Sequence, residues 1–278
     1  MTDKRNYHIF TQSEAIQCLK DRRIVFSGDS MVRQLFLRIV AWFRDLPSVS
    51  EHYFHDSASY TFSREKDELH IGEFQWPRNR SAEDDGVLFR MAFFFESDAI
   101  LLKQSFNELN ADVLVAGINY WVSQVVTYDM LVDPGYYILD RLNQTRPYKK
   151  TEEFGVSDDV AFYWYATPPL GGHSVYERNE ESFGIYTLRN ELMRGTVRYI
   201  NKMANRSIAF VLPSDTFDLS RQFPRNVLED GGFDNHFMCG YQPMFPEPID
   251  YVKTDPKEEC QDLFDYNLMQ VLFNSLCG

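Results

Sequence analysis

The stretch over residues 22–35 constrains the fold most, because it predicts a strand, a sharp turn and a helix in that order. Residues 24–27 form a short apolar run typical of a buried strand, and Gly28-Asp29-Ser30 follows as a turn. The next apolar residues have the spacing of one helix face, at Val32, Leu35, Phe36, Ile39, Val40 and Phe43. We therefore expect a helix over residues 30–44.

Ser30 occupies a position that suits catalysis. It is expected at the carboxyl end of a strand, where open α/β sheets bind ligands, and at a helix N-terminus, where backbone N–H groups favour negative charge. The simpler interpretation is that Ser30 only caps the helix, as serine and aspartate do there. On either interpretation, we expect Arg33, Gln34 and Arg38 to lie away from the apolar face.

Four further apolar runs predict strands, at residues 87–95, 112–117, 160–166 and 207–212. Helical patterns separate them, including a long helix over residues 180–204. The apolar stripe of that helix is expected at Ile185, Leu188, Leu192, Tyr199 and Met203. Strands that alternate with helices predict the α/β class. We expect a doubly wound, mainly parallel five-stranded sheet with helices on both faces, in flavodoxin-like order.

Residues 1–278 are expected to form a single catalytic domain. Residues 51–80 would make an excursion over the sheet, with possible short strands at 60–62 and 69–71. Residues 213–260 would form a long irregular segment, and such segments are uncommon unless they carry function. A last amphipathic helix would follow Asp262 as its cap. Because right-handed crossovers place the strand ends on one rim, Ser30 and the loops after the later strands would meet there.

A catalytic serine needs a base that takes its proton. Among the six histidines, His236 is the first candidate because it lies after the last predicted strand, and His173, after the fourth strand, is the reserve. The oxyanion of a tetrahedral intermediate also needs hydrogen-bond donors. The Ser30 N–H would supply one and the side-chain amide of Asn119 another, although Asn119 could instead cap the next helix.

Three blocks in this order, Gly28-Asp29-Ser30, Gly117-x-Asn119 and His236, resemble those of the SGNH (GDSL-type) hydrolase superfamily. The closer resemblance is to its PC-esterase branch, which includes trichome-birefringence-like polysaccharide O-acetyltransferases and the luminal domain of sialic acid O-acetyltransferases. Further similar stretches are residues 18–26, residues 112–115 leading to Trp121, and residues 236–239 followed by Cys260, Asn267 and Cys277.

The resemblance implies a serine-dependent O-acyl transferase or esterase, acting on carbohydrate hydroxyls through an acyl-serine, with acetyl as the expected acyl group. Ser30 would be the nucleophile and His236 the base. The family places an aspartate three residues before the histidine, where this chain has Phe233, so Asp234 is the substitute and Asp230 the reserve. No tightly bound cofactor or metal is implied, only an acyl donor if the protein is a transferase. The alternative is a catalytically inactive glycan-binding protein on the same fold.

The net charge of −13 argues against nucleic acid or an anionic membrane surface as a partner, because both select basic patches. No apolar run reaches the roughly 18 residues that a membrane span needs. The first residues also lack the apolar core of a signal peptide. The sequence leaves the oligomeric state open.

The cysteines, at positions 18, 239, 260 and 277, form no C-x-x-C pair, so a zinc site is not expected. They allow three disulfide connectivities or four reduced thiols. Glycosylation acceptor triplets begin at Asn79, Asn143 and Asn205. These triplets tilt the expected location towards the secretory lumen or the cell exterior, with the cytosol as the alternative.

Overall fold

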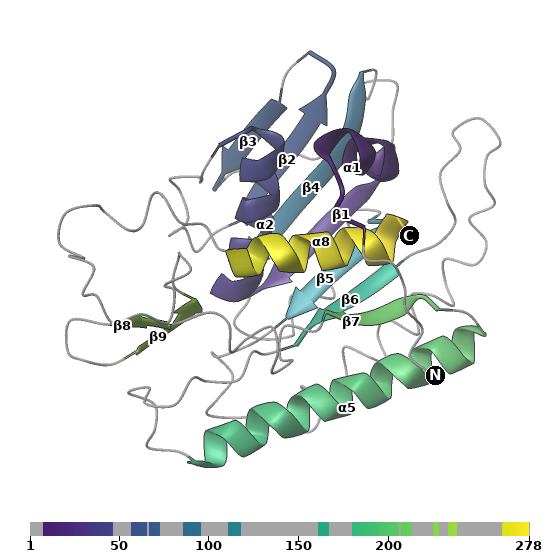
Figure 1. The fold of residues 1–278 in the computed structure, drawn as a ribbon. Helices are drawn as coiled ribbons and strands as arrows, with labels where there is room; N and C mark the ends of the chain where they lie inside the picture. The colour runs from purple at the N-terminus through teal and green to yellow at the C-terminus, as the bar shows by residue number, and fades with distance from the viewer. Residues whose placement is uncertain are drawn as a thin grey trace.

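The computed structural model describes residues 8–46, 57–65, 67–72, 86–95, 111–117, 161–166, 180–205, 207–212, 225–227, 233–237 and 263–277. These residues form an α/β fold around a seven-stranded mixed sheet in the order β3-β2-β4-β1-β5-β6-β7 (Figure 1). The strands are β1 (Arg23–Gly28), β2 (Ser57–Ser63), β3 (Asp67–Ile71), β4 (Val87–Phe95), β5 (Val113–Gly117), β6 (Ala161–Tyr165) and β7 (Ala209–Leu212). The helices are α1 (Gln12–Leu19), α2 (Ser30–Phe43), α5 (Glu180–Ala204) and α8 (Leu263–Cys277).

Five strands, β4-β1-β5-β6-β7, run parallel to one another. Numbered along the chain, their spatial order is 2-1-3-4-5, which is the flavodoxin-like order. The order reverses at β1, whose neighbours are β4 on one side and β5 on the other. This reversal is the topological switch point, where open α/β sheets bind ligands.

The expectation of five strands is wrong, because β2 and β3 extend the sheet at its β4 edge with antiparallel pairing. Within the expected excursion over residues 51–80, the described residues 57–63 and 67–71 therefore form two edge strands of the sheet instead of passing over it. In β2, Ala58 and Tyr60 are fully buried, whereas serine and threonine occupy the alternate positions. This alternation makes the segment polar in average composition although one of its faces belongs to the core.

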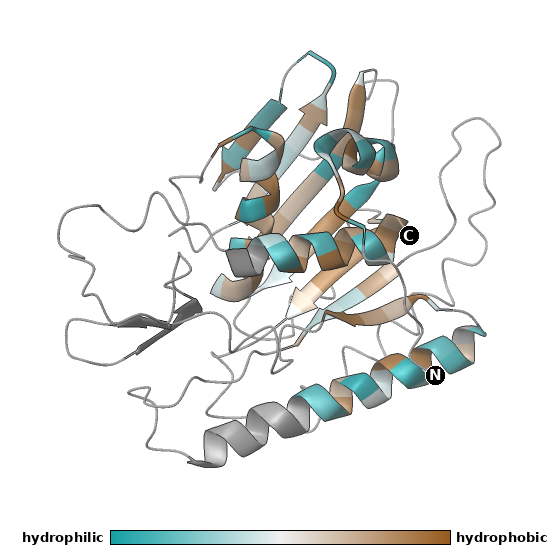
Figure 2. Cartoon of the chain, in the orientation of Figure 1, coloured by the Kyte–Doolittle hydropathy of each residue, from teal (hydrophilic) through white to brown (hydrophobic). Residues whose placement is uncertain are grey.

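Helices cover both faces of the sheet, as expected of a doubly wound fold. In β1, Ile24 and Phe26 belong to the apolar cluster that includes residues of α1, α2 and α8, whereas Val25 belongs to a second cluster with α5. In Figure 2, α8 lies in front of the sheet and α5 lies below it, and brown, apolar positions recur along the strands. Because successive side chains of a strand point to opposite faces of the sheet, the apolar residues of β1 are divided between two cores.

The burial of side chains on α2 and α5 differs from what the sequence predicts. Arg33 is only 4% exposed, and every residue of α2 from 31 to 43 is buried or half-buried. One cause is that α8 covers the outer side of α2, with the Arg38 guanidinium 5.6 Å from the centre of the Tyr266 ring. In α5 the side chains are described over residues 190–203, and the buried apolar ones there are Met193, Val197 and Ile200. Tyr199 and Met203 of the expected stripe are exposed, and Ile185 and Leu188 lie outside that range.

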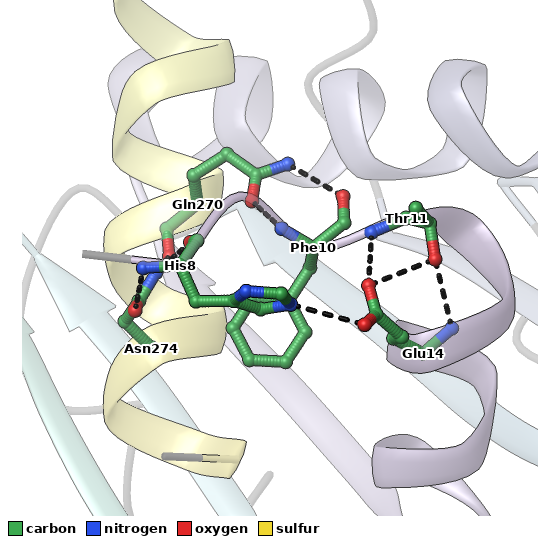
Figure 3. Close-up of polar contacts among 6 residues, drawn as sticks. All are labelled: His8, Phe10, Thr11, Glu14, Gln270 and Asn274. Carbon is green, nitrogen blue, oxygen red and sulfur yellow. Dashed lines mark hydrogen bonds and ion pairs between the residues drawn. The ribbon is translucent and has the colours of Figure 1, made fainter. Parts of the chain in front are cut away.

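Two amide side chains of α8 bind the backbone of the segment that precedes α1 (Figure 3). Gln270 accepts from the Phe10 N–H at 2.8 Å and donates to the Phe10 carbonyl at 3.2 Å. Asn274 does the same with His8, at 3.0 and 2.7 Å. Alternate residues of an extended chain are about 6.6 Å apart, close to the rise of about 6 Å over four helix residues. The amides therefore act as backbone mimics that fasten the N-terminal segment to α8.

We expect Gln270→Met to lower the free energy of unfolding by about 2–4 kcal/mol, because it leaves a buried N–H and a buried carbonyl of Phe10 without partners. Asn274→Leu is the matched control: the corresponding bonds to His8 are solvent-exposed, so its cost should be about 1 kcal/mol. Urea denaturation of both variants measures the difference. Equal costs for the two variants would contradict the importance of the buried pair.

Cys18 in α1 and Cys277 in α8 form a disulfide with a Cα–Cα distance of 5.6 Å. This bond occurs in one of the three connectivities considered above, and the other two cysteines, Cys239 and Cys260, lie outside the described residues. It joins α1 directly to the last helix. The disulfide and the two amides thus all attach α8 to the N-terminal part of the chain, at α1 and at the segment before it.

Cys277→Ser should lower the free energy of unfolding by about 2–5 kcal/mol, because the bond closes a long loop and restricts the unfolded chain. The measurement is urea denaturation with and without a phosphine reductant. Wild-type protein should lose stability on reduction, and most of that loss should be absent in the Cys277→Ser variant. A reductant effect of the same size in both proteins would assign the stabilisation to other cysteines.

Candidate functional site

Ser30 is the first residue of α2, and Asp29 is the cap of that helix. The Asp29 Oδ1 accepts a hydrogen bond from the Met31 N–H at 3.1 Å. The interpretation that Ser30 only caps the helix is therefore wrong. Ser30 is half-buried and follows the last residue of β1, Gly28, by two residues, so it lies at the carboxyl end of a strand, as the sequence predicts.

Two glycines bring the ends of β1 and β5 into close contact next to Ser30. Gly28 and Gly117 are opposite each other in the parallel register. A Cβ atom on Gly28 would collide with the Gly117 carbonyl oxygen, and one on Gly117 would lie 2.8 Å from the Cβ of Tyr165. A Val32 methyl group approaches both glycines, so the first turn of α2 packs directly on the two strand ends. Any side chain at either glycine would push Ser30 away from β5.

Sequence reasoning missed this packing role of Gly117, which it treated only as the start of the Gly117-x-Asn119 block. A usable signal was present. Gly28 and Gly117 each end a fully buried strand, and a glycine at such a point often marks a close approach of two backbones.

Helix α8 packs on the same helix that carries Ser30. Tyr266 contacts Arg38, and the ring centre of Phe273 lies 5.6 Å from that of Trp42. Figure 1 shows the first part of α8 lying across α2.

Asp234 and His236 lie in β9 (Phe233–Phe237), which pairs with β8 (Arg225–Val227) as an antiparallel hairpin. The expectation of an irregular segment over residues 213–260 is therefore wrong at this hairpin. Asp234 and His236 are two positions apart in this strand. The hairpin forms a sheet of its own and does not join the seven-stranded sheet.

The structure brings the segment that carries Ser30 together with the end of β5, whereas the side chains of Asp234 and His236 lie outside the described part of the structure. Asn119, Asp230 and His173, the remaining candidates, lie outside the described residues. The role of each stays a prediction.

Buried phenols are poor candidates for the catalytic base. Burial raises the pKa of Tyr163, on β6, well above its ordinary value. Burial and then the negative charge of Asp67 raise the pKa of Tyr60 in the same way. Both hydroxyls therefore stay protonated at neutral pH.

Within the described ranges, no group of three or more histidine, cysteine, aspartate or glutamate residues could hold a metal ion. In that same part of the chain, no helix is long and apolar enough to cross a membrane. No protein-family model, curated protein or solved structure matches the chain.

Proposed function

We propose that the protein moves acyl groups, with acetyl as the expected group, to or from carbohydrate hydroxyls through an acyl-serine at Ser30. The observation that carries the proposal is the position of Ser30 at the switch point of the sheet, where β1 and β5 end side by side. A half-buried serine there, on the first turn of a helix, combines access for a ligand with a favourable field for negative charge.

The chemistry follows the resemblance to the SGNH superfamily. The Ser30 Oγ attacks the acyl carbonyl while His236 takes its proton. Asp234, or Asp230 in its place, holds the imidazole in position. The Ser30 N–H and the Asn119 amide donate hydrogen bonds to the oxyanion. The alcohol of the acyl donor then leaves, and the acyl group remains on Ser30. His236 next takes a proton from the acceptor, which attacks the acyl-serine.

The molecule that takes the acyl group from Ser30 decides the class of enzyme. Water makes the protein an esterase, and a sugar hydroxyl makes it a transferase with an acyl donor as co-substrate. The resemblance to the PC-esterase branch favours transfer to a glycan and a location in the secretory lumen or outside the cell. The disulfide between Cys18 and Cys277 fits that location, because such compartments are oxidising.

Turnover of p-nitrophenyl acetate, with and without an oligosaccharide acceptor, tests the proposal. We expect release of p-nitrophenol in both cases and, for a transferase, acetylated sugar detected by mass spectrometry when the acceptor is present. Heat-inactivated protein is the control for spontaneous hydrolysis. Glycan binding without any turnover would contradict acyl transfer and support the alternative, a glycan-binding protein without catalytic activity.

A further inference from the structure

Asp29 touches both structural elements that meet beside Ser30, the first turn of α2 and the end of β5. We infer that Asp29 is a positioning residue that fixes Ser30 by joining these two elements through hydrogen bonds. The inference rests on the proposed role of Ser30 as nucleophile.

The first set of bonds holds the helix. The side chain of Asp29 accepts from the Met31 N–H at 3.1 Å, and its main-chain carbonyl accepts from the Arg33 N–H at 3.0 Å. Both acceptors precede Ser30 and both donors follow it, so the two bonds span Ser30. They fix the first turn of α2, which carries Ser30.

The second bond holds the sheet. The Asp29 N–H donates to the Gly117 carbonyl at 3.3 Å, just beyond the last paired residues of β1 and β5. Gly117 is the last residue of β5 and lies two positions before Asn119, the proposed oxyanion donor. Asp29 thus links the segment of Ser30, the proposed nucleophile, to β5, the strand that precedes Asn119 in the chain.

Burial makes these bonds matter. Asp29 is 0% exposed, so water does not replace an acceptor that is removed. Without the carboxylate, the Met31 N–H loses its partner and the first turn of α2 can shift. A displacement of a reacting group by about 1 Å can lower a rate on the order of 100-fold.

The test measures the reactivity of Ser30 itself, with a fluorophosphonate probe. The Ser30 Oγ forms a bond to phosphorus, the P–F bond breaks, fluoride leaves, and the serine proton goes to the base. We expect Asp29→Ala to lower the second-order rate constant of labelling about tenfold or more. Asp29→Asn keeps an oxygen acceptor at a cap position, so its rate should stay within about threefold of wild type.

Thr11→Ala is the matched control. Thr11 caps α1 by accepting from the Glu14 N–H, far from Ser30 along the chain, so its loss costs a similar cap without touching the site. Labelling of this variant should proceed at the wild-type rate. If Asp29→Ala does not fold, Asp29→Gly replaces it, because glycine at a cap position is much less destabilising than alanine while it also removes the acceptor.

Two results would overturn the inference. One is a folded Asp29→Ala or Asp29→Gly protein that is labelled as fast as wild type. The other is an Asp29→Asn protein as slow as Asp29→Ala, which would assign the effect to the charge and not to the bonds. Failure of the proposed function looks different, because wild-type protein would then show no labelling at Ser30.

Discussion

Ser30→Ala should reduce kcat/KM for p-nitrophenyl acetate by about a thousandfold or more, because it removes the atom that carries the acyl group. Folding should be unaffected, since Ser30 is half-buried and the helix cap is supplied by Asp29. Steady-state kinetics and a urea denaturation curve, measured on the same preparation, separate the two effects. The loss should appear in kcat.

Ser27→Ala is the control for this substitution. Ser27 lies three residues earlier in β1, and its buried hydroxyl forms no hydrogen bond with the part of the chain that the structure describes. Its removal should leave kcat/KM within about twofold and the stability equal or slightly higher, because an unsatisfied buried hydroxyl is costly. Retention of full activity by Ser30→Ala would rule out the acyl-serine.

Gly28→Ala should lower the free energy of unfolding by about 3 kcal/mol or more. The added Cβ collides with the Gly117 carbonyl and lies 2.7 Å from a Val32 methyl group, and the first of these neighbours is backbone within a fully buried strand. The two strand ends must separate to admit it. Since Ser30 follows Gly28 by two residues, the protein that does fold should also lose activity.

Gly195→Ala should have the opposite effect on stability in the same experiment. Gly195 is inside α5, and the nearest atom to an added Cβ is an Arg198 guanidinium nitrogen at 4.0 Å. Alanine there should raise the stability by about 0.5–1 kcal/mol, because it restricts the unfolded chain and favours the helix. A Gly28→Ala protein as stable as wild type would contradict the close packing of β1 on β5.

Apolar periodicity predicted the parallel part of the fold, because each of its strands is a short run buried on both faces. The expected helix over residues 180–204 has the same ends as α5, and the expected strand over 87–95 is β4. The hairpin of β2 and β3 was underestimated because only alternate residues of β2 are apolar. The hairpin joins the sheet because β2 pairs with β4, and the paired residues are distant in sequence.

The orientation of α5 and the burial of α2 could not be predicted for a related reason. Met193, Val197 and Ile200 have helical spacing, as do Tyr199 and Met203, so the sequence offers two stripes and only packing against the sheet chooses between them. Arg33 has the composition of a surface residue, but it is buried in a helix that α8 covers on its outer side. The partner helix lies more than 200 residues away in sequence.

At the candidate site, the sequence predicted the strand, the turn and the position of Ser30, because those depend on neighbours along the chain. It could not predict that Gly117 packs on Gly28, because that contact depends on which strand lies beside β1. It also placed Asp234 and His236 in an irregular segment, whereas they occupy alternate positions of a short strand. Short strands of mixed polarity carry little periodic signal.

Rapid-quench peptide mapping tests the acyl-serine most directly. Protein mixed with p-nitrophenyl acetate is acid-quenched within the first turnovers, digested and analysed by tandem mass spectrometry. We predict one acetyl group on the Ser30 hydroxyl in wild-type protein and none in Ser30→Ala. Turnover with no acetyl group on Ser30, or with the group on another residue, would contradict the proposed mechanism.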